Sequence, residues 1–172
     1  MTDMKWTTKN LALCAVLTAL ALGLSTLENL FPVSLVVPLP GVKLGLANIV
    51  TVFALYQLGA GAALAILLTR CLLGGLFAGN LSAILFSVLG GLTAMLVMIF
   101  LRRLPKLSVY GVSIGGAAAH NIGQMAAAVI TLGSTMVLGY LPFLLAASLF
   151  TGALTGFITA LLLRATRHIR FH

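Results

Sequence analysis

The stretch that decides the fold is Gly61–Ala78, GAALAILLTRCLLGGLFA, in which Arg70 is the only charged side chain. An α-helix rises about 1.5 Å per residue, so this stretch makes a helix about 27 Å long. Because the hydrocarbon core of a bilayer is about 30 Å thick, the stretch predicts a transmembrane helix with one charge at membrane depth.

The composition of the whole chain agrees with this interpretation. Of its 172 residues, 61% are apolar and 7% are charged. Soluble domains carry roughly 25% charged residues, so a water-soluble globule is excluded. Eighteen glycines suit helices that approach one another closely in lipid. We expect an all-α integral membrane protein.

Five further apolar stretches complete a predicted bundle of six transmembrane helices in a single domain, residues 1–172. Glycine, proline and charged residues separate the stretches. The stretch 44–58 is short, so it is tilted, kinked or only partly spanning. The six predicted spans are residues 10–27, 44–58, 61–78, 81–101, 112–134 and 140–163.

The basic residues predict the orientation of this bundle. Clusters precede the first span, follow the fourth and follow the sixth, so an even count of six places all of them on one side. The positive-inside rule makes that side cytoplasmic. We therefore expect both termini in the cytoplasm and the chain in the cell membrane, with its first span retained rather than cleaved as a signal peptide.

A set of polar residues remains once these terminal charges are set aside. Ionisable groups at membrane depth are costly and usually face a cavity or a partner, so we take the set as candidate substrate-binding residues. Its members are Glu28, Lys43, Asn48, Arg70, Asn80, His120, Asn121 and Gln124.

Structural roles compete with ligand binding for several of them. Arg70 could equally be tied to backbone carbonyls or to Glu28, and Lys43 could be an interfacial anchor. His120 and Gln124 share one helix face at a spacing of four residues, next to Asn121. Interhelical hydrogen bonds are the alternative for these three.

The scarcity of acids limits the chemistry. Asp3 and Glu28 are the only two carboxylates. Joining prenyl diphosphates requires several oxygen ligands for magnesium, so we expect no enzyme activity of that kind, no metal site and no cofactor. No Walker-type phosphate loop is present, so energy from ATP would have to come from another polypeptide. Nucleic acid is not an expected partner.

Small residues form a stripe on the first span. Ala12, Ala15 and Ala19 lie on one helix face, and Ala15 and Ala19 form a small-x-x-x-small element. Internal packing is one use of such a stripe. Docking against another membrane protein is the other.

Two longer motifs carry a family resemblance. KLGLANIV at 43–50 and GGAAAHNIGQ at 115–124, with RCLLGG at 70–75 and SVLGG at 87–91 between them, resemble the Gx transporter family, also called heptaprenyl diphosphate synthase component I. The resemblance covers nearly the whole chain from about residue 10. That family is similar to the substrate-binding S components of energy-coupling-factor (ECF) transporters.

The resemblance implies six helices, cytoplasmic termini and a ligand pocket near the outer face. It implies that Ala15 and Ala19, with Ala12, dock onto a transmembrane coupling (T) subunit driven by ATP-binding-cassette ATPases. It further implies that the 28–42 loop and the polar residues of the second, third and fifth spans line or gate the pocket.

Two functions follow as hypotheses. The first is a substrate-binding subunit for a small anionic molecule, either vitamin-like or related to isoprenoids and quinones. The second is a non-catalytic membrane component associated with heptaprenyl diphosphate synthase, which makes the menaquinone side chain.

Overall fold

The computed structural model describes residues 7–30 and 45–168. Lys43 and the greater part of the 28–42 loop lie outside these ranges. Within them the chain is helical and has no strand. The elements are α1 (Thr8–Leu30), α2 (Asn48–Gln57), α3 (Ala60–Phe77), α4 (Leu81–Arg102), α5 (Val109–Leu132), the 3-10 helix η2 (Thr135–Tyr140) and α6 (Leu141–Ala165).

Local sequence explains several helix ends. The Asn80 side chain accepts a hydrogen bond from the Ser82 amide and so caps the start of α4. Ser108 caps α5 in the same way, through the Gly111 amide. Gly133, with φ of 63°, ends α5 in the left-handed conformation that glycine adopts without strain.

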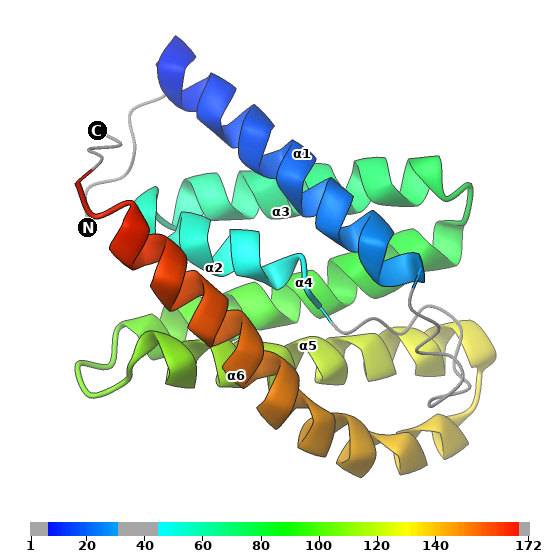
Figure 1. Cartoon of the computed structure of the whole chain (residues 1–172). Coiled ribbons are helices and arrows are strands. Elements are labelled where there is room, and N and C mark those ends of the chain that lie inside the picture. Colours follow the sequence, from blue (N-terminus) through cyan, green and yellow to red (C-terminus); the bar gives the residue numbers. More distant parts are fainter. Residues whose placement is uncertain (1–6, 31–44, 169–172) are drawn as a thin grey trace.

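The six α-helices run back and forth, each roughly reversing the direction of the one before it (Figure 1). Side-chain bonds join the ends of α2, α4 and α6. Arg102 donates to the carbonyl oxygens of Leu55 and Tyr56, and Gln57 donates to the Thr166 hydroxyl across 3.1 Å. These three helices therefore end at the same end of the bundle.

Glycines let α4, α5 and α6 pack closely. A Cβ added at Gly152 of α6 would lie 2.6 Å from the Ile114 Cα of α5, and one at Gly123 of α5 would lie 2.8 Å from the Gly90 Cα of α4. Real Cβ atoms do not approach backbone atoms so closely, so these positions require glycine. The prediction that small residues allow close helix contacts holds here.

Four helical segments are long and apolar enough to cross a membrane: Thr8–Glu28, Ala60–Phe77, Leu81–Arg102 and Thr135–Ala165. The chain therefore has the helical make-up of a membrane protein, although two of the six predicted spans do not meet this criterion. With 10 residues, α2 is about 15 Å long, half of the hydrocarbon thickness. It begins at Asn48 rather than at residue 44 because Gly45, with φ of 87°, is not helical. α5 has sufficient length, but its His, Asn and Gln side chains lower its hydropathy.

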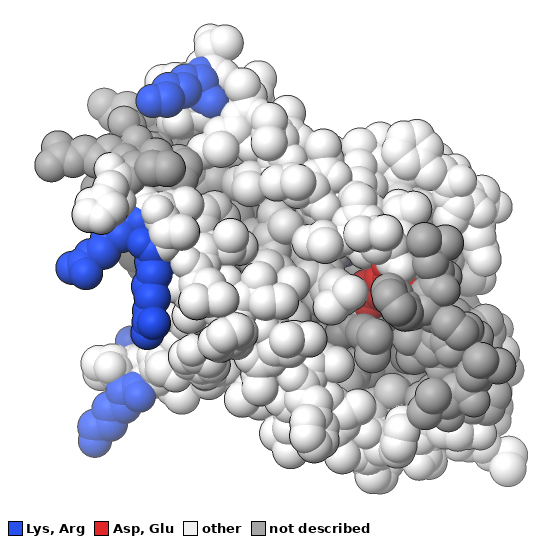
Figure 2. Space-filling view, viewed as in Figure 1, with Lys and Arg blue, Asp and Glu red and all other residues white. Residues whose placement is uncertain are grey.

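The Lys and Arg side chains visible in Figure 2 lie at one end of the molecule. This end, which we call the basic end, contains the start of α1 and the ends of α2, α4 and α6 (Figure 1). The gathering of the basic residues follows from the alternating helix directions. The sequence pattern predicted that the basic clusters would lie on one side of the bundle, and the structure has them at one end.

Candidate functional site

Five of the predicted site residues come together inside the bundle, where they form what we call the polar cluster. They come from four helices: Glu28 lies in the last turn of α1, Asn48 starts α2, Arg70 lies in α3, and His120 and Gln124 lie in α5. None of the five is more than 7% exposed. Burial of so many polar groups in an apolar bundle is expensive unless they are bonded to one another or to a ligand.

Arg70 and Asn48 form the central contact of the polar cluster. The Arg70 Nη2 donates to the Asn48 Oδ1 across 3.3 Å, which joins α3 to the first residue of α2. The Arg70 Nε is buried and finds no hydrogen-bond acceptor among the described residues. A buried donor without an acceptor costs about 1–3 kcal/mol, and more when it is charged. This unmet hydrogen-bonding capacity makes Arg70 the candidate residue for a ligand contact.

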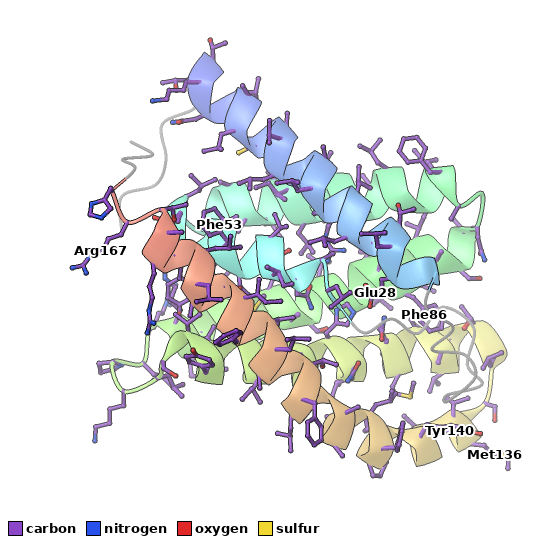
Figure 3. The ribbon with its side chains drawn as sticks, in the orientation of Figure 1. Glu28, Phe53, Phe86, Met136, Tyr140 and Arg167 are labelled. Atoms are coloured by element: carbon purple, nitrogen blue, oxygen red, sulfur yellow. The ribbon has the colours of Figure 1, made fainter. Side chains whose placement is uncertain are left out.

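Glu28 joins the polar cluster through the backbone. Its Oε1 accepts a hydrogen bond from the Gly45 amide, 17 residues away in sequence. Figure 3 shows Glu28 at the end of α1, beside the start of α2. Glu28 is the only acid within the described residues, since Asp3 lies outside them. Its carboxylate and the Arg70 guanidinium thus belong to the same buried group of residues.

Two glycines, Gly45 and Gly90, make room for the polar cluster. A Cβ added at Gly45 would lie 2.9 Å from the Asn48 Nδ2 and 3.7 Å from the His120 Cδ2. At Gly90 of α4 an added Cβ would lie 2.9 Å from the His120 Cε1 and 3.0 Å from the Gln124 Cγ. The His120 ring therefore lies close to both backbones. Sequence reasoning noted both glycines within motifs but did not predict these contacts.

Two of the remaining polar candidates, Asn121 and Asn80, have contacts outside the polar cluster. Asn121 donates to the Leu144 carbonyl across 2.7 Å and so ties α5 to α6, which is the structural alternative weighed for it. Asn80 is exposed and caps α4 at the α3–α4 turn, apart from the polar cluster. Lys43 lies outside the described residues.

The alanine stripe is exposed on α1. Ala15 and Ala19 line a mostly apolar groove between α1 and α3 of about 380 Å³. Ala12 is exposed but does not line the groove. The groove opens on the surface of the bundle, and Thr18 and Thr69 also line it.

The described residues contain no group of three or more His, Cys, Asp or Glu side chains placed to hold a metal ion. The chemistry that the polar cluster offers is therefore hydrogen bonding and charge: one guanidinium, two amides, one imidazole and one carboxylate. Such groups can hydrogen-bond a small polar molecule that carries hydrogen-bond acceptors.

Comparison with known proteins places the chain in a family. No curated protein and no solved structure matches it. The family model described as heptaprenyl diphosphate synthase component I matches residues 17–162. The matched range includes Glu28, Asn48, Arg70, His120 and Gln124, so the whole polar cluster lies within it. The chain belongs to the heptaprenyl diphosphate synthase component I family.

Proposed function

We propose that this chain is the substrate-binding membrane subunit of an ECF-type transporter and has no catalytic activity of its own. In this proposal the six helices cross the cell membrane with both termini in the cytoplasm. The polar cluster binds a small molecule, anionic and either vitamin-like or related to isoprenoids and quinones. A coupling subunit with its ATPases supplies the energy.

The observation that carries the proposal is the buried Arg70. Its Nε has no acceptor among the described residues, although Asn48 fixes the neighbouring Nη2. A guanidinium whose Nη2 is hydrogen-bonded and whose Nε has no acceptor is suited to binding a carboxylate, phosphate or carbonyl oxygen. A purely structural arginine would be expected to use its buried donors on protein acceptors.

The exposed face of α1 supports the partner part of the proposal. Ala15 and Ala19 line a groove of about 380 Å³, which is large enough to take side chains from a helix of another membrane protein that packs against α1. Helices in lipid associate through small residues that allow close backbone contact. The coupling subunit is the partner that we assign to this groove.

We propose that the chain is not catalytic because it has too few carboxylates. Glu28 already accepts a bond from the Gly45 amide, and Asp3 is the only other carboxylate in the chain. Two carboxylates do not provide the oxygen ligands that magnesium diphosphate chemistry needs.

The test is the identity of the molecule that the chain retains. We would purify the full chain in mild detergent and identify co-purifying small molecules by mass spectrometry. Arg70→Ala should lower the retained amount at least about tenfold, the effect of losing a charged hydrogen bond of about 1.5–3 kcal/mol. Arg164→Ala removes the same charge from an exposed position and is the matched control. Equal retention in both variants would remove Arg70 from the site.

The family description favours a second candidate function, a membrane component that works beside a heptaprenyl diphosphate synthase. The two candidates predict different partners in a pull-down of the full chain from its native membrane. Recovery of a coupling subunit with ATPases supports the transporter. Recovery of a prenyl diphosphate synthase supports the second candidate.

A further inference from the structure

A small hollow at the basic end combines an apolar floor with a cationic rim. It has a volume of about 190 Å³ and is lined by Leu55 of α2, Ile99 and Arg102 of α4, and Arg103. Leu55 is buried beneath the hollow, whereas Ile99 is half-buried and the two arginines carry the charge. Aliphatic surface beside two guanidiniums matches the two parts of an amphiphile. It lies at the opposite end of α2 from the polar cluster.

Arg102 is held rigidly at this hollow. Its guanidinium donates to the carbonyl oxygens of Leu55 and Tyr56 and lies over the Tyr56 ring, 4.9 Å from the ring centre. These bonds use two of the five N–H donors of an arginine. The neighbouring Arg103 is exposed. The Arg102 guanidinium is therefore held by hydrogen bonds, whereas the exposed Arg103 guanidinium beside it is able to change its rotamer.

The charge of the basic end is not balanced by acids of the described chain. Within residues 7–30 and 45–168 the only acid is Glu28, which is bonded to Gly45 in the polar cluster. Figure 2 shows the basic side chains of the visible face together at this end. The cations in or just after the last turns of α4 and α6 are Arg102, Arg103, Lys106, Arg164 and Arg167.

We propose that this hollow binds the headgroup phosphate of an anionic phospholipid. The phosphate contacts Arg102 and Arg103, and the first carbons of the lipid lie against Ile99. Arginine pairs with phosphate through parallel hydrogen bonds, and basic pockets at the ends of transmembrane helices take lipid headgroups. The half-buried Ile99 side chain favours a lipid over a free phosphate ion, because only a lipid has carbons to lie against it.

Native mass spectrometry of the full chain in non-ionic detergent tests this proposal. The chain is titrated with dioleoyl phosphatidylglycerol and, separately, with dioleoyl phosphatidylcholine. We expect tighter binding of phosphatidylglycerol. Arg103→Ala should weaken it about fivefold, which corresponds to ~1 kcal/mol per basic residue at a membrane surface. Because Arg103 is exposed, this variant should fold normally, and its thermal unfolding is measured alongside.

Arg164→Ala is the matched control, since it removes the same charge at the same end but does not line the hollow. We expect it to change the affinity less than about twofold. An equal loss in both variants would overturn the proposal in favour of diffuse charge attraction, and so would equal binding of the two lipids. Displacement of phosphatidylglycerol by millimolar inorganic phosphate would show a free-anion site instead. Displacement by farnesyl diphosphate at lower concentrations than the phospholipid would show a prenyl diphosphate site.

Discussion

The contact between α4 and α5 can be tested by the substitution Gly123→Ala. The new Cβ would lie 2.5 Å from the Leu89 carbonyl oxygen and 2.8 Å from the Gly90 Cα, and it would also overlap the Thr93 hydroxyl. That hydroxyl contacts the carbonyl oxygens of Leu89 and Ala119 at 2.8 and 2.9 Å, respectively, and so links the two helices. Two of the three obstacles are backbone atoms, which no change of rotamer can move.

The magnitude follows from these contacts. Overpacking costs about 1–3 kcal/mol. Displacing the Thr93 hydroxyl adds about 0.5–1.5 kcal/mol. We expect Gly123→Ala to lower the free energy of unfolding by about 2–4 kcal/mol. For a chain of this length that lowers Tm by at least about 4 °C.

The assay is thermal unfolding of the purified chain in detergent. Gly61→Ala is the matched control, because no atom lies within 4 Å of its added Cβ. Its Tm should stay close to that of the unsubstituted chain. Adding Thr93→Ala to Gly123→Ala should not restore stability, since the backbone obstacles remain. An unchanged Tm for Gly123→Ala would refute the close packing of α4 on α5.

Three further predictions concern the basic end, α1 and the polar cluster. Arg102→Lys should lower the free energy of unfolding by about 1–2 kcal/mol, because lysine cannot reproduce the forked bonds to the α2 carbonyls, whereas Arg103→Lys should leave thermal unfolding unchanged. Ala19→Phe should fill the α1–α3 groove and abolish recovery of the coupling subunit in a pull-down, while Leu20→Phe, outside the groove, should not; equal recovery would contradict docking there. Gly45→Ala should reduce ligand retention with little change in helical circular dichroism, since φ of 87° strains a non-glycine residue by about 1–3 kcal/mol; full retention would contradict the contribution of Gly45 to the polar cluster.

Hydropathy together with the turn residues predicted the positions of most of the six α-helices to within about three residues. Apolar stretches with turn residues between them gave 61–78 and 81–101, and the structure has Ala60–Phe77 and Leu81–Arg102. The start of α2 could not be predicted, because the backbone angle of Gly45 depends on contacts with Glu28 and Asn48. The 3-10 helix at Thr135–Tyr140 was expected only as a break between spans.

Part of the candidate site could also be predicted from the sequence, and part could not. Helical spacing placed His120 and Gln124 on one face, and both lie beside Gly90. Asn121 follows His120 directly and therefore lies on a different face of the helix, where its side chain donates to the Leu144 carbonyl of α6. The Arg70–Asn48 and Glu28–Gly45 bonds join residues distant in sequence, so a single sequence gives no signal for the pairing.

The most direct test of the polar cluster as a ligand site is an experimental structure of the full chain with its co-purified molecule. We predict that the molecule lies beside Asn48 and His120, with an oxygen about 2.7–3.2 Å from the Arg70 Nε. A structure in which that Nε donates to a protein carbonyl, while the molecule binds elsewhere, would contradict the account.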